Sequence, residues 1–301
     1  MTDTAFRSGF VAVAGRTNVG KSTLLNALVG QKLSIVSDKP QTTRNIIRLI
    51  RTTDTSQMVF LDAPGLHRSH NRLSEYMDEA ALSAIRDVDV ILFLVEEDIA
   101  IGRGDMRILQ TLGDAPCPVI LVINKIDRVP REEVLRKIEL YSRCPQITEI
   151  VPVSARKGIN LDTLVEVIEK YLPEGEPFFP EDMVTDRTER FFVSEILREK
   201  ILRMLSDEIP HGTAVEISKM QQRGNILDIE AVIYCEKKSH KAIIIGKGGE
   251  MLKKIATRSR IDIEELTGMK VNLDVWVKVR DDWREKEYDL KEFGYQQDDE
   301  F

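Results

Sequence analysis

Residues 15–22 have the types and the spacing of a loop that binds phosphate. They read GRTNVGKS, which fits the pattern GxxxxGK(S/T), and they lie between a short apolar run and a helix-length segment. The backbone N–H groups of such a loop and of the following helix supply the donors that phosphate oxygens need. Lys21 would add positive charge at the β- and γ-phosphates, and Ser22 would offer a hydroxyl to Mg²⁺. The nucleotide contacts predicted from this segment are Gly15, Arg16, Thr17, Asn18, Val19, Gly20, Lys21, Ser22 and Thr23.

A DxxG pattern at residues 62–65 would supply the metal and γ-phosphate contacts that the first loop lacks. It closes an apolar run at residues 57–61, so Asp62 would end a buried strand and could hold Mg²⁺ directly or through water. Gly65 could donate its N–H to the γ-phosphate and couple that phosphate to the loop beyond it. DxxG is too short to be informative alone, and its value comes from its position after the phosphate-binding loop.

Residues 124–127, which read NKID, predict that the base is guanine. Guanine presents two adjacent donors, and the carboxylate of Asp127 can accept both, whereas adenine has neither. Lys125 can lay its methylene stem along the base, and a backbone N–H from residues 154–155 can reach the guanine O6. The residues predicted to select the base are Asn124, Lys125, Asp127, Ser154 and Ala155. Four motifs in this order, each at the end of a predicted strand, predict a GTP site.

Short apolar runs alternate with longer amphipathic segments over residues 1–172. The runs are rich in Val, Ile and Leu, as expected of strands buried on both faces of a parallel sheet, and they cover residues 10–14, 57–61, 88–95, 119–123 and 149–153. Helices are predicted near residues 21–30, 73–86, 103–112, 130–141 and 160–171. The alternation predicts a doubly wound, mostly parallel α/β domain whose ligand lies at the carboxyl ends of the strands.

Residues 173–186 interrupt this alternation with three prolines, two adjacent phenylalanines and five acids. The composition predicts a linker, although Phe178 and Phe179 could instead dock on either neighbouring domain. The remaining segment, residues 187–301, predicts a second domain. Its elements are, in order, a helix to about residue 205, strands at 213–218 and 226–235, an apolar segment ending at 245, a glycine turn, a helix to about 266 and a strand at 270–279.

The glycine turn at residues 246–249 has the form GxxG, and basic residues surround it. Residues 237–260 hold eight Lys or Arg against one Glu, inside a chain whose net charge is −7. A turn without side chains lets a sugar–phosphate backbone lie against N–H groups at a helix start, and the local positive charge would attract it. The element order resembles the type II KH fold, an α+β domain that binds RNA. The predicted RNA contacts are Ile245, Gly246, Lys247, Gly248, Gly249, Lys253 and Lys254. The alternatives are an ordinary turn and a solvated helix face.

The composition indicates an ordinary globular protein. The 301 residues are 42% hydrophobic and 31% charged, and no stretch approaches the roughly 18 apolar residues of a membrane-spanning helix. The three cysteines form no CxxC pair, so neither a zinc site nor a disulfide framework is indicated. We therefore expect a cytoplasmic protein, and we expect it to act as a monomer.

Residues 16–26 and 41–44 resemble the translation-factor-related bacterial GTPases that include the Era, Der and tRNA-modification families. In that group the second threonine of a pair completes the Mg²⁺ shell, which here implies Thr43 beside Ser22 and Asp62. The alternative for this threonine is a polar loop without a ligand. A GTPase domain followed by one type II KH domain is the architecture of the Era family. Further stretches resemble that family at residues 178–182, 185–187, 194–200 and 276–279.

The resemblance also carries expectations about catalysis. The residue after DxxG is Leu66 rather than the glutamine that orients water in Ras-like enzymes, so another group assists hydrolysis or hydrolysis is slow. The tRNA-modification family implies a monovalent cation, K⁺, held partly by Asn18; the alternative is that Asn18 only shapes the loop. The residues expected to act in catalysis are Asn18, Lys21, Thr43 and Gly65.

The resemblance to the Era family further implies binding near the 3′ end of small-subunit ribosomal RNA, a GTP-gated role in maturing the small ribosomal subunit, and peripheral membrane association. Three other functions fit the sequence less well. A GTPase switch for a protein or membrane partner would use the KH-like domain as a scaffold and leave the basic cluster unexplained. A tRNA-modification enzyme would need paired catalytic cysteines. A phosphate-loop kinase would leave the guanine specificity of Asp127 unexplained.

Overall fold

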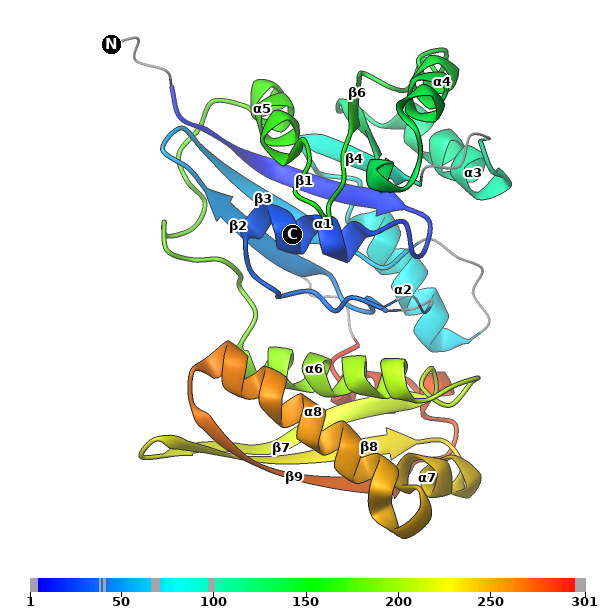
Figure 1. The fold of residues 1–301 in the computed structure, drawn as a ribbon, viewed down its shortest axis with the longest axis vertical. Helices are drawn as coiled ribbons and strands as arrows, with labels where there is room; N and C mark the ends of the chain where they lie inside the picture. The colour runs from blue at the N-terminus through cyan, green and yellow to red at the C-terminus, as the bar shows by residue number, and fades with distance from the viewer. Residues whose placement is uncertain (1–4, 38, 40–41, 66–70, 97–100, 296–301) are drawn as a thin grey trace. The chain divides into compact units, whose positions relative to one another are not determined.

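The computed structural model describes residues 5–37, 39, 42–65, 71–96 and 101–295. The chain divides into two compact units, the first built mainly from residues up to 186 and the second mainly from residues from 187 onward (Figure 1). In the described part of the chain, no helix combines the length and the apolar composition needed to cross a membrane.

The first unit contains a six-stranded sheet in the order β2-β3-β1-β4-β5-β6. The strands are β1 (Arg7–Gly15), β2 (Ile47–Thr52), β3 (Ser56–Asp62), β4 (Val90–Val95), β5 (Val119–Ile123) and β6 (Glu149–Pro152). The helices are α1 (Lys21–Val29), α2 (Arg72–Ser83), α3 (Arg103–Thr111), α4 (Arg131–Tyr141) and α5 (Leu161–Tyr171). The pairs β1–β3, β1–β4, β4–β5 and β5–β6 are parallel, which confirms the predicted mostly parallel α/β fold.

Strand β2 is a sixth strand that the apolar-run criterion did not predict. It pairs antiparallel with β3 at the edge of the sheet, and its sequence IRLIRT mixes arginines with apolar residues. The predicted strands are ones buried on both faces, such as β3 and β4, in which every residue is buried. An edge strand keeps one side partly in solvent, so polar residues interrupt its apolar pattern.

Helices of the first unit cover the sheet because alternate strand residues point to opposite faces. Ala12 and Ala14 of β1 pack in one core cluster with Ile108 of α3 and Tyr141 of α4. The intervening residues of β1 face the other side, and α1 contacts both β1 and β3. Both faces of the central strands are therefore buried from solvent. The loops at their carboxyl ends start from rigid elements.

The segment 173–186, predicted to be a linker, is hydrogen-bonded to the edge of the first unit. The buried amide of Gln57 accepts from the N–H groups of Phe178 and Phe179 at 2.8 and 2.9 Å and donates to the carbonyl of Phe179 at 2.9 Å. The ring of Phe178 lies 5.0 Å from that of Phe10. Of the two docking alternatives for the phenylalanines, the structure therefore shows contact with the nucleotide domain.

The second unit has a three-stranded sheet in the order β7-β8-β9, with β7 antiparallel and β9 parallel to β8. Its elements are α6 (Glu189–Met204), β7 (Thr213–Arg223), β8 (Ile226–Cys235), α7 (Lys238–Ile245), α8 (Glu250–Thr267), β9 (Lys270–Val279) and α9 (Glu287–Glu292). This order confirms the predicted type II KH fold. Strand β7 runs five residues beyond its predicted end at Ser218, past a register shift between Ile217 and Lys219.

One face of this second sheet forms the core of the unit. Alternate residues of β8 pack against α6 and α8 in a cluster that includes Leu227, Ile229, Ala231, Ile233, Val193, Leu197, Ile201, Ile255 and Ile263. Trp283, fully buried, donates its indole N–H to the carbonyl of Gly212 at 3.0 Å and so fastens the chain after β9. Ile244 of α7 belongs to the same core, so α7 and α8 are both anchored, one on each side of the glycine turn.

Candidate functional site

The loop of residues 15–20 joins β1 to α1 and approaches the other loops closely. Gly20 has φ +99, and a β-carbon there would lie 2.4 Å from the amide nitrogen of Asn124. A β-carbon at Gly15 would lie 2.7 Å from the carbonyl oxygen of Leu94. Asn18 also has positive φ, at 68°. Because only glycine fits these two positions, the loop can lie directly against the carboxyl ends of the neighbouring strands.

Lys21, at the first position of α1, points back into this loop. Its ammonium donates to the carbonyls of Gly15 and Arg16, each at 3.1 Å. Burial lowers the pKa of Lys21 from 10.5 to about 8, and the nearby carboxylate of Asp62 opposes part of that change. A β-carbon at Gly65 would lie 3.2 Å from the same ammonium, so the DxxG segment reaches the phosphate-binding loop as predicted.

Three oxygen-bearing side chains meet beside Lys21. The hydroxyl of Ser22 donates to Asp62 at 3.1 Å and lies 3.4 Å from the hydroxyl of Thr43, while Thr23 follows on α1, partly buried. A carboxylate and two hydroxyls are the hard oxygen donors that Mg²⁺ prefers, so this set fits the ion. Leu66, which bears on the catalytic expectation, lies outside the described residues.

Asn124 lies buried between three loops. Its Nδ2 donates to the carbonyl of Val19 at 2.9 Å, and its Oδ1 accepts from the N–H of Lys125 at 2.8 Å and from that of Ala155 at 3.1 Å. Of the backbone N–H groups at residues 154–155, one of which was predicted to reach guanine, that of Ala155 is thus directed at Asn124. The side chain links the phosphate-binding loop to the base-selecting loop.

Asp127 is exposed where the base is expected, and its carboxylate is held in its charged form. The hydroxyl of Ser154 donates to Asp127 at 2.5 Å, and this hydrogen bond is the main reason that the pKa of Asp127 lies below its ordinary value. Ser154 therefore contributes through its side chain, which the prediction had not used. Lys125 donates from its ammonium to the carbonyl of Asn18 at 2.9 Å and pairs with Glu96.

Glu96 is the site residue that the sequence reasoning missed. It follows directly after β4, at the same carboxyl edge of the sheet as the recognised motifs, and it pairs with Lys125 and lies 3.8 Å from Arg16. No motif contains it. Its position after a buried parallel strand was the one signal that could have identified it.

The GxxG turn lies between α7 and α8 in the second unit. Gly246 has φ +75, and a β-carbon there would lie 2.8 Å from the β-carbon of Met251, so residue 246 must be glycine. Gly248 and Gly249 also have positive φ, with open space around each. The turn brings backbone N–H groups to the start of α8, and Ile245 ends α7 beside it, partly buried.

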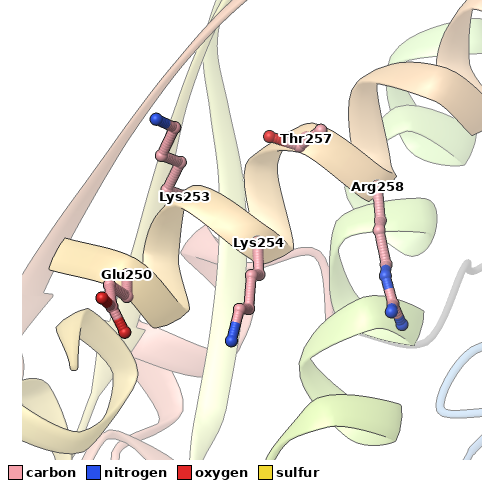
Figure 2. Close-up of a pocket in the computed structure, with 5 residues that line it drawn as sticks. All are labelled: Glu250, Lys253, Lys254, Thr257 and Arg258. Atoms are coloured by element: carbon pink, nitrogen blue, oxygen red, sulfur yellow. The ribbon is translucent and has the colours of Figure 1, made fainter. Parts of the chain in front are cut away.

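Basic residues follow the turn along α8. A cavity of about 440 Å³ is lined by Glu250, Lys253, Lys254, Thr257 and Arg258. Figure 2 shows Lys254 and Arg258 extending to one side of the helix, while Lys253 and Thr257 extend to the other. Lys247, Lys253 and Lys254 are exposed. The predicted contacts Lys253 and Lys254 thus lie exposed on opposite sides of the helix that starts at the turn.

Comparison with known proteins identifies a GTPase domain and a KH domain in this chain. Residues 10–125 match the family model for a 50S ribosome-binding GTPase, and residues 208–284 match that for a KH domain. The chain is 53% identical to GTPase Era of Clostridium beijerinckii over 291 residues, covering 96% of this chain and 98% of that protein. It is 51% identical to GTPase Era of Clostridioides difficile over 293 residues, with 96% and 99% covered.

A crystal structure of Era in complex with MgGDPNP and nucleotides 1506–1542 of 16S ribosomal RNA is similar over 97% of this chain and 100% of that one, with a TM-score of 0.93 and 42% identity. A variant of Aquifex aeolicus Era bound to GDP·AlF4⁻ has the same TM-score and identity. With the phosphate-binding loop, the guanine-selecting loop and the KH turn in these positions, the chain belongs to the Era family of GTPases.

Proposed function

We propose that this GTPase binds single-stranded RNA from the 3′ region of small-subunit ribosomal RNA through its KH domain and acts in assembly of the small ribosomal subunit. The observation that carries the proposal is the GxxG turn, open at Gly248 and Gly249 and followed by the basic helix α8. The relative whose structure is so similar was solved with an RNA segment from that region.

In the nucleotide domain, we assign charge stabilisation to Lys21 and γ-phosphate contact to the N–H of Gly65. The buried ammonium of Lys21 lies in a low-dielectric site, where its attraction for phosphate charge is stronger than in water. Mg²⁺, when bound, would neutralise phosphate charge, and Ser22, Thr43 and Asp62 would hold it.

Base selection is assigned to Asp127. The hydrogen bond from Ser154 orients the carboxylate of Asp127, so both oxygens can accept from guanine. Asn124 acts by holding the two loops together rather than by facing solvent, because its side chain is buried and bonded on both sides.

The RNA assignment is tested by replacing Lys247 and Gly248 with aspartates in the full chain. Negative charge would then stand where phosphate must lie, so we expect fluorescence anisotropy with a 16S 3′-end oligonucleotide to show at least a tenfold loss of affinity. GTP binding should persist because its motifs belong to the other unit. The matched control replaces Arg223 and Gly224 with aspartates, since Gly224 also has positive φ and open surroundings in the β7–β8 turn.

Full RNA binding by the Lys247–Gly248 variant would contradict the proposed site. A wild-type chain that binds no single-stranded RNA would favour the alternative in which the KH-like domain is a scaffold for a protein or membrane partner. The role of K⁺, the cytoplasmic location, the monomeric state and the peripheral membrane association stay predictions.

A further inference from the structure

Arg16 belongs to the phosphate-binding loop, yet its side chain is directed at helix α3. Its Nε lies 2.9 Å from a carboxylate oxygen of Asp105, a residue in the first turn of α3 whose side chain is only 2% exposed. The backbone carbonyl of Arg16 accepts from the ammonium of Lys21 at 3.1 Å. Arg16 therefore contacts the phosphate-binding lysine through its backbone and forms an ion pair with a buried acid through its side chain.

The start of α3 is shaped to receive this side chain. A β-carbon at Gly104 would lie 2.7 Å from the Cδ of Arg16, and one at Gly102 would lie 3.8 Å from its Nη1. Any other residue at position 104 would displace the arginine stem. The arginine that packs over the start of α3 thus explains the glycine at position 104, whereas a β-carbon at position 102 would make only ordinary van der Waals contact with it.

The same guanidinium lies near Glu96, which connects it to the base-selecting loop. One carboxylate oxygen of Glu96 is 3.8 Å from Arg16, and the other pairs with the ammonium of Lys125. Lys125 also donates to the carbonyl of Asn18 at 2.9 Å, in the phosphate-binding loop. The chain of contacts runs from Asp105 through Arg16, Glu96 and Lys125 back to the loop that holds Arg16.

We infer that Arg16 is a positioning residue that fastens the phosphate-binding loop to α3 through Asp105 and to the base-selecting loop through Glu96. It would act on the nucleotide through Lys21, whose ammonium donates to the carbonyl of Arg16, and through Lys125, which pairs with the same Glu96. It would not act as a phosphate ligand. The inference rests on the nucleotide site proposed above and assigns Arg16, Glu96 and Asp105 to guanine-nucleotide retention. Loosening α3 should therefore speed nucleotide release.

The test is a double-mutant cycle in the full chain with Arg16→Ala, Asp105→Ala and both together. We expect stopped-flow release of a fluorescent GDP to speed up about tenfold in each single variant, with no further increase in the double variant, because the pair acts as one unit. Arg16→Lys should release GDP at a rate much closer to that of the wild type than Arg16→Ala does. The KM for GTP should rise by a larger factor than kcat falls, because a positioning residue acts first on nucleotide retention.

The matched control is Glu149→Gln, which breaks the exposed ion pair of Glu149 with Lys170 in the same domain and should leave GDP release unchanged. Asp105→Ala with wild-type release, beside a fast Arg16→Ala, would overturn the inference, because Arg16 would then act without the ion pair to α3. Multiplied effects in the double variant would also overturn it. Lys21→Ala tests the proposed nucleotide site separately, since GDP binding should fail there whether or not Arg16 is held by α3.

Discussion

Asn124→Ala is expected to separate the two loops that hold the nucleotide. The wild-type side chain makes hydrogen bonds of 2.9, 2.8 and 3.1 Å to Val19, Lys125 and Ala155. At about 1 kcal/mol for each intramolecular hydrogen bond, the three together contribute about 3 kcal/mol. The substitution also leaves the carbonyl of Val19 without this donor in a buried place.

The nucleotide affinity should fall because the loops no longer hold their binding arrangement before the nucleotide arrives. If that arrangement loses about 3 kcal/mol of support, the competent fraction falls by up to roughly 100-fold, and the apparent Kd for GDP rises by the same factor. Asn124→Asp keeps the two acceptor contacts but sets a carboxylate oxygen against the buried carbonyl of Val19, so its loss should be at least as large as that of Asn124→Ala. Isothermal titration calorimetry measures the Kd values, and urea unfolding without nucleotide measures stability.

Asn26 provides the matched control because it makes the same three kinds of hydrogen bond at the far end of α1. Its Nδ2 donates to the carbonyl of Ser34 at 2.8 Å, and its Oδ1 accepts from the N–H groups of Leu33 and Ser34 at 2.9 and 2.8 Å. Asn26→Ala should therefore lower the free energy of unfolding with little effect on GDP affinity. An Asn124→Ala protein that loses stability but keeps its wild-type Kd for GDP would refute the assigned linking role.

Three further outcomes are expected. Asp127→Asn should shift preference from GTP toward XTP by on the order of 10- to 100-fold, because the new amide donates where guanine also donates; unchanged affinities for both nucleotides would exclude Asp127 from base selection. Replacing Na⁺ with K⁺ should speed hydrolysis, and Asn18→Ala should abolish the difference while nucleotide binding persists; equal rates in both salts would leave Asn18 with loop shape alone. Lys253→Ala or Lys254→Ala should lower the affinity for all RNA sequences alike and reduce the dependence of log affinity on log salt concentration by roughly one phosphate contact. A sequence-selective loss would point instead to base contact.

Much of the chemistry was predictable because each motif is a short continuous segment whose residue types are set by its own local geometry and ligand. The phosphate-binding loop needs glycines where its turns have positive φ or approach another strand, and such needs are visible locally at Gly15 and Gly20. The same holds for the KH turn at Gly246. The order of buried apolar runs also predicted the parallel strands, since burial on both faces demands apolar residues throughout.

Contacts between distant segments depended on the tertiary structure. The sequence alone gives no reason to connect Arg16 with Asp105, or Gln57 with Phe178 and Phe179, because polar residues far apart carry no local signal of their pairing. Strand β2 was missed for a related reason, since an edge strand is defined by the neighbour it pairs with.

The kinds of ligand were predictable from the sequence, through short motifs whose residues must lie close to phosphate, guanine or RNA. How those motifs hold one another is seen only in the folded chain, where Asn124 turns inward, Ser154 is directed at Asp127 and Glu96 lies between two cations. The physical reason is that hydrogen bonds and ion pairs act over a few ångströms, and the register of the buried strands determines which distant residues come within that range.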